Sequence, residues 1–165
     1  MRVGLTSSGA TLSGPNGYTG GGLSDPLQIA VDSSGSPWIA NSGAIPVVPA
    51  VIRISNAGSF LSGPNGYTSS WLQAPYDVAI DGSGNAWITD YSGLVELSSS
   101  GTVLFHTPGG VGRIVAVDGS GDVWGSKGGS FVEYVGLSTP VVTPIAAGLP
   151  ATPTADGSSK LGTRP

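Results

Sequence analysis

Leu27-Gln-Ile-Ala-Val-Asp-Ser-Ser-Gly-Ser-Pro-Trp38 is a stretch of twelve residues whose pattern the chain repeats twice more. The other copies are Tyr76-Asp-Val-Ala-Ile-Asp-Gly-Ser-Gly-Asn-Ala-Trp87 and Arg113-Ile-Val-Ala-Val-Asp-Gly-Ser-Gly-Asp-Val-Trp124. Each copy has alternating apolar residues, a turn that contains glycine, and then a tryptophan. This pattern predicts a β-hairpin, because period-two alternation marks strands and glycine supplies the positive φ of a tight turn. Three copies in register predict a repeat architecture in which neighbouring units stabilise one another.

The spacing of the copies gives the length of the unit. Asp32, Asp81 and Asp118 each stand six residues before the tryptophan of their copy. An insertion at 42–50 lengthens the first unit, and the third lacks a Ser-Gly-Pro-Asn-Gly-Tyr-Thr loop that occurs at 13–19 and 62–68. Without these differences the unit is about forty residues long, which is the length of one four-stranded propeller blade.

Within a unit we expect four antiparallel strands, named a to d in chain order. Strands a are expected at 27–32, 76–81 and 113–118, and strands b, which begin with the tryptophan, at 38–41, 87–90 and 124–127. Strands c are expected at 51–55, 94–97 and 131–135, and strands d at 59–62 and 102–106. The aspartate that ends strand a is expected to cap the following turn with its own side chain. The three tryptophans are expected to pack between blades, since each buried ring removes roughly 150–250 Å² from water.

The predicted fold is therefore all-β: a partial β-propeller of about three four-stranded antiparallel blades. The propeller segment is expected at 1–137, with blade remnants at 1–13, 26–62, 75–106 and 112–135, followed by a tail at 138–165 rich in Pro, Ala, Thr and Ser. The tail is expected to be flexible from about residue 150, because few large apolar residues offset the entropy of ordering it. Three blades are fewer than the usual four to eight. Either the chain is a fragment of a longer propeller, or it is a half-ring that closes by self-association.

Composition argues against several classes of partner and site. The formal net charge is −4 with six Lys and Arg, so a nucleic-acid-binding surface is not expected. No apolar run is long enough to span a membrane. Cysteine is absent and there is one histidine, His106, so neither a metal site nor a cofactor is expected. The Asp-Gly-Ser-Gly turns lack the glutamate that ends a calcium loop, and a tryptophan strand follows them instead.

The repeats resemble the NHL-repeat and streptogramin-lyase-like (virginiamycin B lyase-like) family of β-propellers. The shared signature stands here as Pro26-Leu-Gln-Ile-Ala-Val-Asp32 with Trp38-Ile-Ala-Asn41, and as Pro75-Tyr-Asp-Val-Ala-Ile-Asp81 with Trp87-Ile-Thr-Asp90. The third copy departs from it, with Gly112 in place of the proline and Gly125-Ser126-Lys127 at the strand end. The resemblance covers about residues 1 to 137 and implies the propeller fold.

The resemblance also implies what a catalytic site would contain. Lyases of this family use a histidine base, glutamates and magnesium. Here His106 is expected on the outermost strand, as an exposed residue far from a central site. Glu96 and Glu133 are expected on strands c. The lyase site cannot be placed on these residues, so no catalytic residue is predicted.

The connections indicate where a ligand would bind. The a–b and c–d turns are expected to be tight and the b–c and d–a connections long, which places the long loops together on one face, the loop face. The residues that we expect to bind a ligand there are Asn16, Tyr18, Asn65, Tyr67, Trp71, Asp90 and Tyr91. The alternative is that Pro-Asn-Gly is only a turn and that the tyrosine ring covers a seam between blades.

The sequence thus favours a non-enzymatic propeller segment that binds a ligand or a protein partner on the loop face. One alternative is a fragment of a lyase- or lactonase-like enzyme whose catalytic residues lie outside this chain. Another is a structural or assembly module. The low charge and the abundance of Thr, Ser, Gly and Asn suggest a bacterial protein of the extracellular space or cell envelope, although this chain carries no signal peptide.

Overall fold

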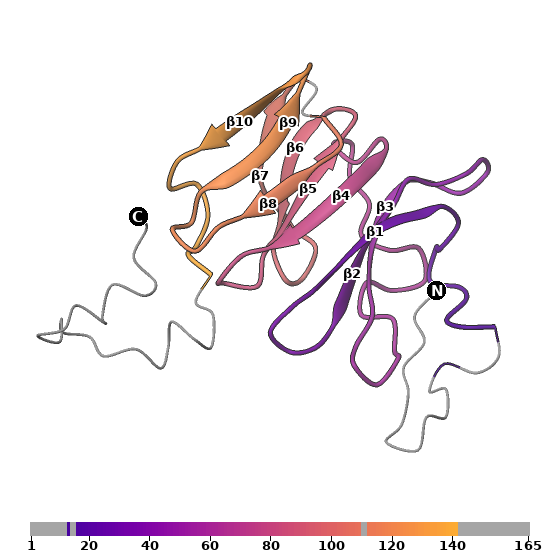
Figure 1. Ribbon diagram of the computed structural model, residues 1–165. Helices are drawn as coiled ribbons and strands as arrows, with labels where there is room; N and C mark the ends of the chain where they lie inside the picture. Colours follow the sequence, from indigo (N-terminus) through magenta and orange to yellow (C-terminus); the bar gives the residue numbers. More distant parts are fainter. Residues whose placement is uncertain (1–12, 14–15, 110–111, 142–165) are drawn as a thin grey trace, which may run out of the picture.

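The structure is a computed structural model that describes residues 13, 16–109 and 112–141. These residues form β-strands and no helix, and the strands form three antiparallel sheets (Figure 1). The first sheet holds β1 (Pro26–Val31), β2 (Pro37–Asn41) and β3 (Ala50–Arg53). The second holds β4 (Pro75–Ile80), β5 (Ala86–Asp90), β6 (Gly93–Leu97) and β7 (Val103–Pro108). The third holds β8 (Val115–Val117), β9 (Val123–Lys127) and β10 (Ser130–Tyr134). The predicted all-β class is confirmed.

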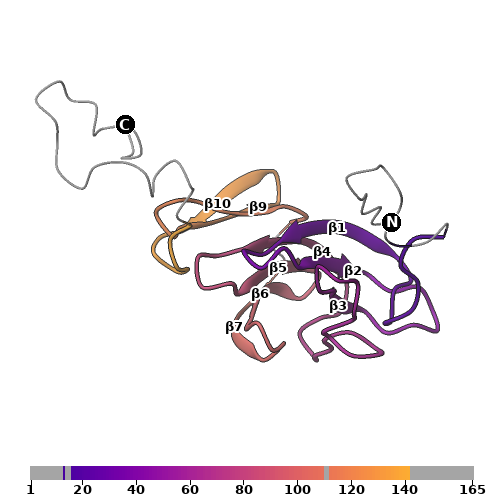
Figure 2. The ribbon, with the colours of Figure 1, turned by 90° about the horizontal axis from the view of Figure 1, so that it is seen from below.

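The three sheets follow one another in chain order, with the second between the other two (Figures 1 and 2). The first strands of the units touch across the boundaries, since β1 contacts β4 and β4 contacts β8. Each sheet then continues away from these strands in sequence order. This arrangement is that of adjacent propeller blades, whose first strands lie nearest the hub.

Each sheet has two faces of different composition. The register of the hairpins pairs Ala30 with Trp38, Ala79 with Trp87 and Ala116 with Trp124. These residues define the Trp face of each sheet. Because successive side chains point to opposite sides of a strand, the other face carries the branched residues of the first strands. We call it the Val/Ile face.

Two apolar seams hold the sheets together, and both have the same construction. In the first seam the Trp face of the first sheet, with Trp38 and Val51, packs on the Val/Ile face of the second, with Val78 and Ile88. In the second seam Trp87 and Leu94 of the second sheet belong to one cluster with Val115 and Val123 of the third. Trp38 and Trp87 are completely buried, which confirms the packing role predicted for them. At about 25 cal/mol per Å² a buried indole stabilises the fold by up to roughly 4–6 kcal/mol.

The aspartates that precede the tryptophans cap the turns, as the sequence predicts. Oδ1 of Asp81 accepts the backbone N–H groups of Ser83 and Asn85, both over 2.9 Å. The equivalent oxygens of Asp32 and Asp118 accept the N–H groups two and four residues further along. A buried carboxylate is stable here because it is hydrogen-bonded to amides that the turn would otherwise leave unpaired.

The prediction of a strand at 59–62 is wrong in the extent of that strand. In the first sheet the outermost strand is reduced to two isolated bridges, Ile54 with Phe60 and Val51 with Tyr67. The Gly-Pro-Asn-Gly loop at 63–66 lies between the two bridges and interrupts the pairing with β3. Proline lacks an N–H donor and glycine favours turn conformations, so this segment does not continue a ladder.

Most of the first and last segments predicted from the sequence lie outside the described residues. The expected c–d pair at 1–13 lies there except for Ser13, and so does the tail from 142 onward. Residues 138–141 lie beside the β4–β5 turn of the second sheet and the β8–β9 turn of the third. Gly82 N donates to Thr139 O over 3.0 Å, and Ser138 N donates to Gly121 O over 2.9 Å. No helix of the described part is long and apolar enough to cross a membrane.

Candidate functional site

The residues predicted to form one ligand site lie in four places. Asn16 and Tyr18 line a cavity of about 380 Å³ on the Val/Ile face of the first sheet. Asn65 lines a second cavity, of about 600 Å³, beside the insertion residues Pro46 to Val48. Tyr67 lies in the first seam. Only Trp71, Asp90 and Tyr91 come together, where the segment 71–74 is hydrogen-bonded to residues 90–92 at one end of the second sheet. We call this group the Trp71 corner.

Tyr67 packs in the first seam, and Tyr18 packs on the Val/Ile face of the first sheet. The ring of Tyr67 lies 5.8 Å from that of Trp38, and its hydroxyl donates to Ser99 O over 3.3 Å. A Cβ added to Gly101 would overlap the Tyr67 ring, and one added to Gly58 would lie 2.6 Å from Tyr18. Both glycines stand in the turn that follows strand c. The tyrosine that ends each Gly-Pro-Asn-Gly-Tyr copy therefore packs on the turn of the next unit. This matches the alternative interpretation of the sequence, in which the tyrosine ring covers a seam between blades.

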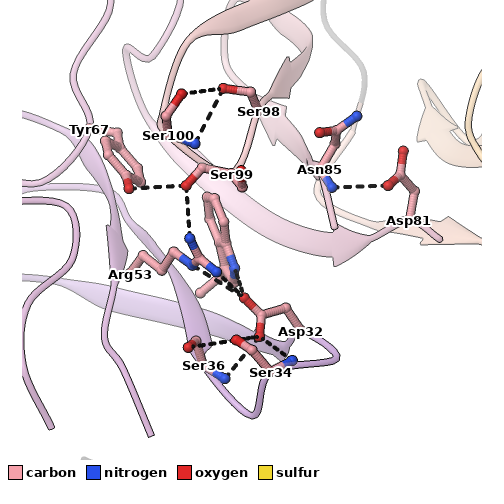
Figure 3. Close-up of polar contacts among 11 residues, drawn as sticks. Asp32, Ser34, Ser36, Arg53, Tyr67, Asp81, Asn85, Ser98, Ser99 and Ser100 are labelled. Atoms are coloured by element: carbon pink, nitrogen blue, oxygen red, sulfur yellow. Dashed lines mark hydrogen bonds and ion pairs between the residues drawn. The ribbon is translucent and has the colours of Figure 1, made fainter. Parts of the chain in front are cut away.

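A polar cluster closes the same end of the first seam (Figure 3). Arg53 from β3 forms an ion pair with Asp32 at 2.7 Å and donates from Nη1 to Ser99 O over 2.8 Å. Its guanidinium also lies 4.9 Å from the centre of the Trp38 ring. Arg53 thus links the first sheet to the second sheet's turn. Burial of Asp32 acts to raise its pKa, but hydrogen bonds from Ser34, Trp38, Ser36 and Arg53 together hold that pKa well below its usual range. The cluster binds the two sheets to each other.

The equivalent position on the second sheet holds a carboxylate in place of the guanidinium. Glu96 pairs across the strands with Trp87, as Arg53 pairs with Trp38. Partial burial raises the pKa of Glu96, the nearby Asp81 adds to that rise, and a hydrogen bond from Asn85 Nδ2 over 2.9 Å opposes it. The repeat therefore conserves the position but not the charge, and only the first seam gains an ion pair there.

Asp90 organises the Trp71 corner from within. It is completely buried at the end of β5. Its two oxygens accept the N–H groups of Gln73 over 3.1 Å, Ala74 over 2.9 Å and Ser92 over 2.8 Å. The predicted role of Asp90 as a polar contact for a ligand does not fit this geometry, because its carboxylate is enclosed by backbone amides. Asn41 is its counterpart in the first sheet, where Oδ1 accepts the N–H groups of Ser24 and Asp25.

Trp71 and Tyr91 are the exposed aromatic side chains of this corner. The Trp71 ring stacks on His106 of β7, with ring centres 3.5 Å apart and planes inclined by 28°. Its carbonyl accepts the Ser92 hydroxyl over 2.6 Å, and the adjacent Leu72 is buried in the first seam. Trp71 nevertheless stays 41% exposed and Tyr91 69% exposed. The Trp71 indole is therefore held in place by the His106 ring and is still partly exposed to solvent.

Two expectations about this region are corrected by the structure. His106 is not an exposed strand residue: it is half-buried beneath Trp71, and its Nε2 is buried without a hydrogen-bond partner. No local sequence signal indicates this stack, because the two residues meet only after the strands pair. The b–c connections are also not uniformly long, since only two residues separate β5 from β6 and β9 from β10. Among the described residues no three His, Cys, Asp or Glu side chains are grouped to hold a metal ion.

Comparison with known proteins identifies the fold. No protein-family model and no curated protein sequence matches the chain. Among solved structures, a streptogramin B lyase is similar with a TM-score of 0.51 and 19% identity over 67% of this chain. A gluconolactonase-like protein is similar with a TM-score of 0.52 and 17% identity over 72% of it. PorZ, a surface component of the type-IX secretion system of Porphyromonas gingivalis, is similar with a TM-score of 0.55 and 15% identity over 89%.

These similarities extend over part of each known protein. The chain spans 40% of the lyase, 48% of the gluconolactonase-like protein and 21% of PorZ. At such low identity the likeness concerns the fold alone. The chain has the fold of a segment of a lyase-like β-propeller, as the sequence predicts.

Proposed function

We propose that this chain is a binding segment of a β-propeller and that its ligand stacks on the Trp71 corner. The observation that carries the proposal is the Trp71–His106 stack, in which a large aromatic ring is immobilised and yet 41% exposed. Ligand sites are typically lined by aromatic side chains with a few placed polar groups. A ring that is already ordered loses little conformational entropy when a ligand covers it.

The polarity of the corner favours a neutral ligand that carries hydroxyl or amide groups. Apart from His106 under the ring, the residues around Trp71 are Ser69, Ser70 and Gln73, which neighbour it along the chain, and Ser92, whose hydroxyl donates to its carbonyl; these four are uncharged. The one carboxylate, that of Asp90, already accepts three backbone N–H groups, so it offers little to a cation. An oligosaccharide fits this chemistry best, since a sugar presents an apolar face to the ring and hydroxyls to its rim. A short uncharged peptide is the second class to test.

The proposal is tested by screening the full chain against glycan and uncharged-peptide arrays and then measuring affinity by titration calorimetry. Replacing Trp71 by Ala should weaken binding at least about tenfold, and replacing Tyr91 should weaken it less, because a buried aromatic anchor contributes more than a rim residue. Leu61→Ala is the matched control, since Leu61 is exposed and its N–H donates to Arg53 O at the far end of β3.

The outcomes separate the candidate functions. Binding that Trp71→Ala removes and Leu61→Ala leaves intact supports the proposal. Absence of any ligand, or binding indifferent to Trp71→Ala, contradicts it and favours an assembly module or part of an enzyme whose site lies elsewhere. A location outside the cytoplasm belongs to the same proposal. Fractionation of the native source with an antibody against the chain tests it, and recovery in the cytosol would contradict it.

A further inference from the structure

The described residues form an arc of three sheets, in which one Val/Ile face and one Trp face are not covered by another of these sheets. At the first sheet the Val/Ile face is open along β1: Ile29 is 54% exposed, whereas its counterpart Val78 is buried in the first seam. Over β2 and β3 the same face is covered by Tyr18, Leu23 and Phe60, which pack on Ile39, Ile52 and Ile54. The register identifies them as counterparts, since Ile29 pairs with Ile39 as Val78 pairs with Ile88. The cavity of about 380 Å³ lies on this face and is lined by Leu27, Ile29, Ile39 and Ile54 among others.

At the third sheet the Trp face is open. Phe131 is 74% exposed, whereas its counterparts Val51 and Leu94 are completely buried in the two seams. All three side chains occupy the same position, because each pairs with the residue two places after the tryptophan of its sheet. The open face of the third sheet is therefore the face that the first and second sheets bury.

We propose that the open Trp face of one copy of this chain packs on the open Val/Ile face of a second copy. The chain already forms this kind of contact twice, at both of its seams, so the third contact continues an interface that the structure contains. Face composition sets the direction: a Trp face meets a Val/Ile face in both seams.

A contact between two different faces is heterologous, so it forms either a closed ring or an open chain of copies. With three sheets in the described part of each copy, two copies that each provide one Trp face and one Val/Ile face close a ring of six sheets. Six lies within the four to eight blades of typical propellers, whereas three copies would give nine. The proposed assembly is therefore a dimer with a two-fold axis along the central channel. It rests on residues distinct from those of the Trp71 corner.

The test is sedimentation equilibrium of the full 165-residue chain over a wide range of concentration. We expect a species with twice the 16.3 kDa of one chain. Ile29→Glu and Phe131→Glu should each raise the dimer dissociation constant on the order of 100-fold, because each places an unpaired charge in a seam. Leu104→Glu is the matched control, since Leu104 is similarly exposed but lies on β7 at the outer edge of the second sheet.

Each outcome decides the matter. Dimerisation that both variants weaken and the control does not supports the proposal. A dimer that only one variant weakens would indicate contact between like faces and overturn it. A wild-type monomer at all concentrations would also overturn it and would assign the open faces to other parts of this chain or to further blades of a longer protein. Circular dichroism checks folding, and Ile29→Ser and Phe131→Ser, with the same expected direction, replace any variant that does not fold.

Discussion

The indole Nε1 of Trp38 donates a hydrogen bond to Oδ2 of Asp32 over 3.0 Å. The same bond joins Trp87 to Asp81 over 3.3 Å and Trp124 to Asp118 over 3.2 Å. One carboxylate thus caps the turn with one oxygen and fixes the indole with the other. This double role explains the constant spacing of six residues between aspartate and tryptophan, since the ring reaches the capping group only from that position of the next strand.

Asp81→Ala should lower the free energy of unfolding by about 2–4 kcal/mol. The change leaves the buried indole N–H of Trp87 without its acceptor, which is destabilising by about 1–3 kcal/mol, and it removes two part-buried turn hydrogen bonds from Ser83 and Asn85 that contribute about 0.5 kcal/mol each. Urea unfolding measures the change. Asp25→Ala is the control, because Asp25 is exposed, and it should alter stability by less than about 0.5 kcal/mol. Equal effects of the two substitutions would contradict the double role.

Stability should fall in acid because of Asp32. A pKa held below its usual range in the folded state stabilises the fold above the unfolded pKa of about 3.9, and that contribution is lost as the pH falls toward the folded value. Unfolding free energies measured in urea from pH 7 to pH 2 should therefore decline below about pH 4. Asp32→Asn should flatten this decline. A variant that shows the same acid dependence as the wild type would assign the effect to other carboxylates.

Glu96 should act in the opposite direction. Burial raises its pKa in the folded state, so the fold favours the protonated form, and this contribution is lost as the pH rises through the folded pKa. Glu96→Gln keeps an acceptor for Asn85 and removes the buried charge. The variant should have a melting temperature equal to or above that of the wild type at pH 7, with the difference gone at pH 4. A lower melting temperature at pH 7 alone would show that the ionised form is stabilising.

Gly101→Ala should be more destabilising than Gly84→Ala. Both glycines have positive φ, at 84° and 79°, so both substitutions strain the backbone by about 1–2 kcal/mol. A Cβ at Gly84 meets open space, whereas one at Gly101 overlaps the Tyr67 ring. Chemical denaturation should therefore show an additional loss of at least about 1 kcal/mol for Gly101→Ala. This additional loss of stability should shrink when Gly101→Ala is made in the Tyr67→Ala background. If the loss stays unchanged there, the Tyr67 ring is not its cause.

Asp90→Asn should disturb the Trp71 corner more than its small change in shape suggests. An amide in place of the carboxylate turns a donor toward one of the three N–H groups that Asp90 accepts. Asn41 is suited to its own site because its Nδ2 donates to Gly22 O over 3.1 Å, whereas the ionised Asp90 carboxylate only accepts hydrogen bonds. We expect faster amide hydrogen exchange at Gln73, Ala74 and Ser92, measured by NMR. Unchanged exchange there would show that the carboxylate does not hold the corner.

The sequence by itself determined the repeat and, with it, the hairpins, the capped turns and the burial of Trp38 and Trp87. The hairpins and capped turns depend on contacts within one unit, and which side chains are buried follows from alternation along a strand. The local spacing of residues determines both. Only the tertiary structure decided that Tyr67 packs on Gly101, that Trp71 stacks on His106 and that Asp90 is enclosed by amides. Residues far apart along the chain make these contacts, which exist only once sheets pair and pack, so no local pattern encodes them.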